Sequence, residues 1–249
     1  MRSGSITRAF VAGTVLLLSA SSLQASPSVP EVKQQLKQAM TKRKPLQQFW
    51  KDMHSRYGGE ALSPVLKILA DETERDEVRW ATIFGVARMA GKKSYGLLSK
   101  YSRHKSWVLR DASLRAMAAL EARELSADIQ RAAFTDPALV VRTTAVAVIG
   151  HLKLKSAAPQ LIEAISDPRN YRRGKSLWIS DHILAVLKDW RHKPAVPALV
   201  EILEKTTDTR LQGKVIASLE AIMGKSFDRK SASEQVYLWK RALTAEKVF

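Results

Sequence analysis

The chain has 249 residues, of which 45% are hydrophobic and 26% charged, a composition that supplies a sizeable core and argues against general disorder. It contains no cysteine, which excludes disulfides, zinc–thiolate sites, cysteine nucleophiles and lipid-modified cysteine. The formal net charge of +17 predicts attraction to anionic partners, such as nucleic acid, a phosphorylated glycolipid, an anionic membrane surface or an acidic protein.

The N-terminus has the pattern of an export signal. Arg2 and Arg8 provide a positive flank, residues 9–20 are apolar or small throughout, and a small-residue stretch that ends at Ala25 follows. The apolar run is shorter than the roughly 20 residues that span a bilayer. We therefore expect a signal peptide over residues 1–25, cleavage after Ala25, and an exported, periplasmic mature chain without a transmembrane segment. The alternative is an uncleaved anchor or an ordinary N-terminal helix.

After a short leader at residues 26–30, the chain reads as successive helices separated by turns that contain proline, glycine and charged residues. The expected helices cover residues 31–42, 45–57, 61–70, 76–90, 95–102, 107–122, 124–134, 138–151, 157–166, 176–189, 195–205, 208–223 and 232–246. We divide them into N-terminal capping helices over residues 31–59, a repeat region over 60–226 and a C-terminal capping helix over 227–249.

One type of helix recurs in the repeat region at a nearly constant spacing. It opens on an apolar residue followed by arginine, at Val78-Arg79, Leu109-Arg110 and Val141-Arg142, with arginines 31 and 32 residues apart. Apolar residues follow on most sides of each of these helices, so other helices must cover most of their surface. We interpret them as the inner helices of a stack.

A second type of helix alternates with the first and carries proline in its first turn, where the missing N–H group costs nothing. These prolines are Pro64, Pro159 and Pro197. Glycines at the ends of inner helices, Gly91, Gly150 and Gly224, predict left-handed C-terminal caps.

This alternation resembles HEAT repeats, above all the short bacterial version also found in phycobilisome lyase-type proteins. The matching positions are Asp76, Val78, Arg79 and Ala81, then Asp136, Val141, Arg142 and Ala145, and for the C-terminal cap residues 224–227 with Trp239 and Lys240. The resemblance covers roughly residues 60–247 and implies an all-α, right-handed α-solenoid of antiparallel helix pairs, with about 12 to 13 helices. It says almost nothing about activity, because a fold does not imply a function.

The arginines Arg79, Arg110 and Arg142 form a ladder with two interpretations. As a functional feature, they would be a row of cations on the concave face. As a structural feature, which we favour, each guanidinium would bridge turns within and between neighbouring repeats, as the resemblance implies.

Basic turns follow the inner helices and are expected to line up along one edge of the stack as a positive rim. The rim residues singled out for binding are Lys92, Lys93, Lys153 and Lys155. The alternative is a solvated surface that serves solubility only.

The longest irregular stretch covers residues 167–175 and leads to Trp178. It lies where the spacing of the prolines lengthens to 38 residues and where Ser180 replaces the ladder arginine, so it is interpreted as an inserted loop. Arginine and aromatic residues dominate binding hot spots, which makes this loop a candidate anchor. Its candidate residues are Arg169, Tyr171, Arg172, Arg173, Lys175 and Trp178.

The sequence contains no complete catalytic motif. Gly174-Lys175-Ser176 and Gly224-Lys225-Ser226 resemble the end of a phosphate-binding loop, but Arg169 and Leu219 stand where its first glycine is needed. The five histidines lack metal-ligand spacing. We therefore expect no enzyme activity, no cofactor and no metal site.

Two functions remain. The first is an exported scaffold that binds a protein or an anionic envelope component along its concave face or basic rim. The second is nucleic-acid binding, because helical-repeat alkylpurine DNA glycosylases are similar in repeat type and charge. The export signal disfavours the second, and a chromophore lyase activity would rest on fold analogy alone.

Overall fold

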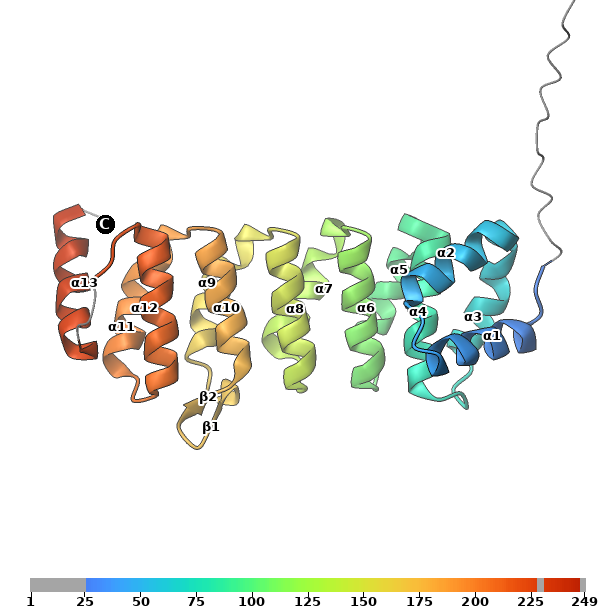
Figure 1. Ribbon diagram of the computed structural model, residues 1–249, viewed down its shortest axis with the longest axis horizontal. Coiled ribbons are helices and arrows are strands. Elements are labelled where there is room, and N and C mark those ends of the chain that lie inside the picture. The colour runs from blue at the N-terminus through green and yellow to red at the C-terminus, as the bar shows by residue number, and fades with distance from the viewer. Residues whose placement is uncertain (1–25, 228–230, 247–249) are drawn as a thin grey trace, which may run out of the picture.

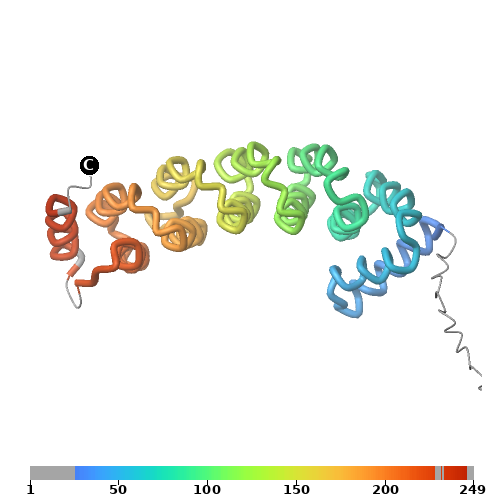
Figure 2. Tube along the Cα trace, turned by 90° about the horizontal axis from the view of Figure 1, so that it is seen from above, coloured from blue at the N-terminus to red at the C-terminus, as the bar shows by residue number. Residues whose placement is uncertain are grey.

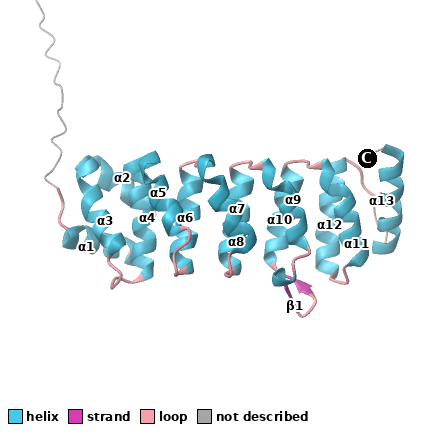
Figure 3. Cartoon of the chain, turned by 180° about the vertical axis from the view of Figure 1, so that it is seen from behind, coloured by secondary structure: helices cyan, strands magenta, loops and turns pink. Residues whose placement is uncertain are grey.

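The computed structural model describes residues 26–227 and 231–246, and in these parts the protein is built from α-helices joined by short turns, with one small β-hairpin (Figures 1 and 3). The expected signal peptide lies outside the described residues. Among the helices of the described ranges, none combines the length and the apolar character needed to cross a membrane.

Helices follow one another along the chain, and a pair of short strands interrupts them once. In chain order the elements are α1 (Val29–Thr41), α2 (Leu46–Tyr57), α3 (Leu62–Ala70), α4 (Asp76–Ala90), α5 (Tyr95–Tyr101), α6 (Trp107–Ala119), α7 (Ser126–Thr135), α8 (Leu139–His151), α9 (Ala158–Ile165), β1 (Tyr171–Arg172), β2 (Lys175–Ser176), α10 (Trp178–Asp189), α11 (Val196–Lys205), α12 (Thr209–Met223) and α13 (Ala232–Glu246).

The positions of the expected helices are confirmed, with ends that differ by at most three residues. Helix α1 begins at Val29 instead of residue 31, so the last two residues of the expected leader are helical. The cause is a capping box, in which the Ser28 side chain accepts from the Glu31 N–H while the Glu31 carboxylate accepts from the Ser28 N–H.

The helices form a curved row of two layers (Figure 2). In one layer α4, α6, α8, α10 and α12 each pack on the next, and in the other layer α3, α7 and α11 pack mainly on α4, α8 and α12. Helices α5 and α9 lie against α6 and α10 in the same way. Figure 2 shows that the first of these layers forms the inner side of the curve, where α2 bends over one end.

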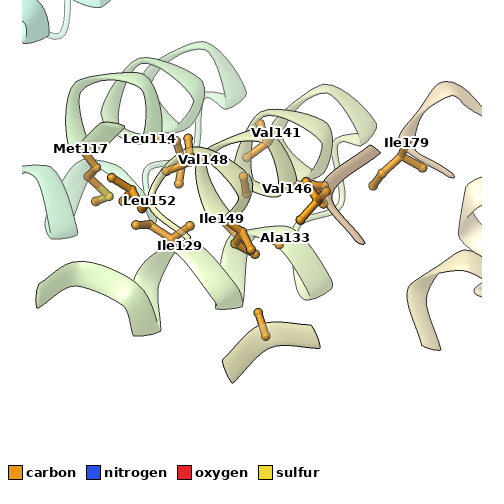
Figure 4. Close-up of a cluster of buried hydrophobic side chains, with 14 of the residues drawn as sticks. Leu114, Met117, Ile129, Ala133, Val141, Val146, Val148, Ile149, Leu152 and Ile179 are labelled. Carbon is orange, nitrogen blue, oxygen red and sulfur yellow. The ribbon is translucent and has the colours of Figure 1, made fainter. Parts of the chain in front are cut away.

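The core runs without interruption between neighbouring helices (Figure 4). Leu114 and Met117 of α6, Ile129 of α7 and Ile149 of α8 are all fully buried. Burial of each such side chain stabilises the fold by about 1.5–3 kcal/mol, so the stacking of helices on their neighbours supplies most of the stability.

The left-handed glycine cap expected from the sequence is confirmed at Gly224, with φ 67° and ψ 26°. Gly91 ends α4 with a positive φ of 53° but a ψ of −132°, which lies outside the left-handed helical region, and the prediction is wrong at Gly150. Gly150 lies inside α8, and the residue with positive φ after this helix is Lys153, at 53°. A Cβ atom on Gly150 would lie 2.6 Å from Cγ2 of Val186 in α10. This glycine therefore allows α8 and α10 to approach closely, which is a packing role that its local sequence does not distinguish from a cap.

The expected irregular loop before α10 is a hairpin, which corrects that interpretation and adds a strand pair to the expected all-α fold. β1 pairs with β2 in antiparallel fashion, and Arg173 and Gly174 between them have φ values of 51° and 75°. Positive φ at both central residues is the requirement of a type I′ turn, which matches the twist of the two strands. The hairpin projects from the edge of the row at which α9 ends and α10 begins (Figure 1).

Candidate functional site

A groove of about 1510 Å³ lies along the inner side of the row. Residues of α2, α4, α6, α8 and α10 line it, so it crosses the inner layer of helices. Its floor contains small side chains, Ala87, Ala118, Ala119 and Ala147, where larger residues would fill the space. The curvature of the row and these small residues together create the groove.

Trp50 fixes helix α2 as the wall at one end of the groove. Its side chain is buried, and its Nε1–H donates to the carbonyl oxygen of Ala81 in α4 at 2.9 Å. A Cβ atom on Gly85 would lie 2.9 Å from the indole ring, so α4 can receive this tryptophan only because a glycine stands there.

Aromatic side chains line the groove on both sides of α6. Trp80 and Phe84 of α4 contact each other edge to face, with ring centroids 4.8 Å apart. Trp178, at the start of α10, is 53% exposed and also lines the groove. An exposed tryptophan beside an apolar floor offers contact area that is not used within the described part of the chain.

The charged side chains that line the groove are all basic. They are Lys51, Arg88 and Arg115, with His151 and His182 as further polar groups, and none of the described lining residues is Asp or Glu. Lys51 and Arg88 are exposed and make no ion pair with any described residue. The groove therefore combines an apolar floor with a positive potential.

Asp111 lies beneath the centre of the groove and joins three helices. It is buried and accepts hydrogen bonds from Arg115 Nε (2.7 Å), from Thr144 Oγ1 in α8 (2.6 Å) and from Trp80 Nε1 in α4 (3.4 Å). Arg115 Nη2 also donates to Thr144 Oγ1 at 3.2 Å. The guanidinium of Arg115 thus has a fixed orientation, although half of its side chain is exposed.

The arginine ladder lies inside the protein, away from the groove. Arg110 forms a two-pronged ion pair with Asp136, at 2.7 and 2.8 Å, and donates to the carbonyl oxygens of His104 and Lys105. Arg79 donates to the carbonyl oxygen of Leu69 at 3.0 Å. All ladder residues are less than a tenth exposed, so they connect turns and helices and present no free cation.

Arg142 connects the ladder to the hairpin. Its Nη1 donates to the Asp136 carbonyl oxygen at 2.9 Å, and its Nη2 donates to Asn170 Oδ1, also at 2.9 Å. Burial, followed by repulsion from Arg169, lowers the pKa of Arg142 from its usual value. These bonds hold the base of the hairpin in a fixed place relative to α8.

The candidate residues of the loop differ in what they can offer a partner. Arg169 is bound to Asp167 and to the carbonyl oxygen of Phe134, and the Tyr171 hydroxyl donates to the Ile165 carbonyl oxygen at 2.9 Å. Burial, with Asp208 as the second cause, raises the pKa of Tyr171. The charged side chains exposed on the hairpin are Arg172, Arg173 and Lys175.

The candidate residues of the rim lie at the opposite edge from the hairpin, in the turns that follow α4 and α8 (Figure 1). All four lysines are exposed. Lys92 forms an ion pair with Glu124 at 2.9 Å, which raises the pKa of this lysine, whereas Lys93, Lys153 and Lys155 make no ion pair with any described residue. The structure thus places the loop and the rim at opposite ends of the helices. Of the candidate residues, only Trp178 lines the groove between them.

The sequence interpretation missed Lys51, Arg88 and Arg115. One signal was available, since the residue after each ladder arginine, namely Trp80, Asp111 or Thr143, faces the inner side. Asp111 and Arg115 are four residues apart, so they share a face of their helix. An acid and an arginine at this spacing in an otherwise apolar helix indicate a polar feature on that face.

Within the described ranges no three His, Asp or Glu side chains gather in a way that could hold a metal ion. No family model matches the chain, and no curated protein matches it. The functional interpretation therefore depends on the groove itself.

Proposed function

We propose that this protein is an exported, non-enzymatic binding protein built as a right-handed HEAT-type α-solenoid. Two observations support the architecture. Inner helices with a buried arginine recur 31 and 32 residues apart, and each inner helix packs on the next while an outer helix covers it. In such a stack, neighbouring units repeat one set of contacts and leave a long inner surface for a ligand.

Export to the periplasm is the second part of the proposal. The order of positive flank, apolar run and small residues in 1–25 supports a signal peptide that is removed after Ala25. In a chain without cysteine, the mature protein would depend on packing, the buried ladder and helix caps for its stability outside the cytoplasm.

The groove is the observation that supports a binding function. Its apolar floor, its exposed Trp178 and its exclusively basic charges fit a protein segment, or an anionic envelope component with apolar groups. The exposed cations of the rim and the hairpin would attract such a partner from a distance and raise the rate of association. A nucleic acid fits the groove less well, because three cations neutralise few phosphates and the floor offers mainly apolar contact.

A charge change at Ala147 tests this proposal. Ala147 is exposed on α8 and lines the groove, so Ala147→Glu adds a negative charge there, and Ala147→Gln adds the same volume without charge. The mature protein would be used to select binders from a displayed library of random peptides, and separately titrated with a DNA duplex and with anionic vesicles at two salt concentrations.

The proposal predicts that peptides or vesicles bind the wild-type protein and that Ala147→Glu weakens this binding about tenfold or more, well beyond Ala147→Gln. Binding that neither substitution changes would exclude the groove. Duplex binding that falls steeply with salt, without peptide or vesicle binding, would favour the nucleic-acid function instead. Full-length protein that remains unprocessed in the cytoplasm of a Gram-negative host would contradict export.

A further inference from the structure

The guanidinium of Arg115 has unused donors at the middle of the groove. A guanidinium carries five N–H groups. Arg115 uses its Nε–H on Asp111 and one Nη2–H on Thr144. The two N–H groups of Nη1 and the second of Nη2 have no acceptor among the described residues.

These free donors form a two-pronged edge that suits a carboxylate. Asp111 and Thr144 bind the Nε side of the guanidinium, which leaves its Nη1–Nη2 edge for a ligand. Planar N–H pairs of this kind bind a carboxylate through two parallel hydrogen bonds. Because Asp111 is buried and also holds Trp80 and Thr144, the arginine is oriented before any ligand arrives.

The residues around Arg115 indicate the chemistry of the groups that flank a bound carboxylate. Arg115 lies on α6, which is the central helix of the five that line the groove. Ala118 and Ala119 lie one turn further along the same helix, and aromatic residues come from α4 on one side and from α10 on the other. A carboxylate at Arg115 would therefore be flanked by apolar groups on both sides.

We infer that Arg115 is the specificity anchor of the groove, and that it binds the carboxylate of an Asp or Glu side chain in an otherwise apolar peptide segment of a partner protein. Asp111 and Thr144 are its positioning residues. The inference rests on the proposed function and narrows it, because it names a polypeptide as the ligand and one acidic residue as its central feature. Helices pack about 8–10 Å apart, so the part of the groove from α4 to α10 is about 24–30 Å long and takes about seven to nine extended residues.

The test compares peptides selected from a displayed library of random nonapeptides by the wild-type protein and by Arg115→Gln, Arg115→Lys and Arg88→Gln. Arg115→Lys keeps the charge but lacks the planar pair of donors, and Arg88→Gln removes another cation of the same groove. A selected peptide and its variant with Gln in place of the acidic residue are then titrated against each protein. Thermal unfolding followed by circular dichroism establishes that each variant is folded.

The wild-type protein is expected to select one acidic residue at a fixed position between apolar residues. Arg115→Gln and Arg115→Lys should keep the apolar preference, lose the acidic one, and bind the acidic peptide about 10 to 100 times more weakly. Their affinity for the Gln peptide should change little, and Arg88→Gln should keep the acidic preference.

Three other results would overturn the inference, and they can be told apart. If Arg115→Gln still selects the same acidic position, or if Arg88→Gln is the variant that loses it, Arg115 is not the anchor although the groove still binds peptides. If no peptide is enriched but anionic vesicles bind, the inference fails and the proposed function stands. If neither peptides nor vesicles bind, or if Ala147→Glu leaves the enriched peptides bound, the proposed function fails and the inference fails with it.

Discussion

Substitution of Gly150 by alanine tests whether α8 and α10 need to be in close contact at this position. Alanine is favoured over glycine inside a helix by about 1 kcal/mol, so without neighbours Gly150→Ala would stabilise the protein. The new Cβ atom, however, would lie 2.6 Å from Cγ2 of Val186, well inside the ordinary carbon–carbon contact of about 3.5–4.0 Å. Overpacking of this kind costs about 1–3 kcal/mol, so a net destabilisation of up to about 2 kcal/mol is expected.

Gly213 provides the matched control, because it is exposed inside α12 and nothing lies within 4 Å of the Cβ position. Gly213→Ala should stabilise the protein by up to about 1 kcal/mol. Val186→Ala alone should destabilise it by roughly 1.6 kcal/mol or more, because about two buried methyl groups are lost. In the double variant with Gly150→Ala the clash is absent, so the double change should cost about 1–3 kcal/mol less than the sum of the single changes.

Urea unfolding of the protein, followed by far-ultraviolet circular dichroism, gives these free energies from the midpoint and slope of each transition. If Gly150→Ala stabilised the protein as much as Gly213→Ala does, or if its effect simply added to that of Val186→Ala, close contact between α8 and α10 at this position would be refuted.

Three further changes test other features by the same unfolding assay. Asp136→Ala leaves the buried Arg110 without its carboxylate partner and should lower the free energy of unfolding by about 3–5 kcal/mol. Replacing both residues by apolar ones should lower it much less, and equal losses would refute the ion pair. Lys153→Gly relieves the left-handed backbone after α8 and should stabilise by about 1 kcal/mol, and Lys153→Ala, which loses the same charge, should not. Burial, and then repulsion from Arg79, lowers the pKa of His104, so the unfolded chain binds a proton more readily than the folded protein does. Stability should therefore fall as the pH decreases from above the unfolded pKa towards the folded one, and His104→Gln should flatten this slope while the exposed His182→Gln serves as control.

The helices could be predicted from the sequence because their signals are local. Prolines such as Pro159 in first turns, apolar residues at helical spacing and glycines such as Gly91 at helix ends depend only on neighbouring residues. Gly150 shows the limit of such signals. A glycine near the end of a helix indicates a cap by its position, but contact with Val186 of another helix decides its role.

The hairpin and the groove could not be predicted for a related reason. Asn-Gly is the usual sequence signal of a type I′ turn, and Arg173-Gly174 lacks this signal. The two strands have two residues each, which is too short to show the alternation of apolar and polar residues that predicts a strand. The groove depends on the curvature of the row and on α2, which Trp50 holds against α4. The alanines of its floor are indistinguishable in sequence from ordinary packing residues.

The packing of each helix on its immediate neighbours has a consequence for how the chain folds. Side-chain contacts between consecutive inner helices, such as those of Asp111 with Trp80 and Thr144, join residues 31 and 33 positions apart. The ends of the described chain therefore never have to meet, and a folded pair of helices can grow by adding the next one. Helices at the two ends are covered on one side only, so their amide hydrogens should exchange with solvent before those of α6 and α8. The middle of the groove would then be the last part of the molecule to open.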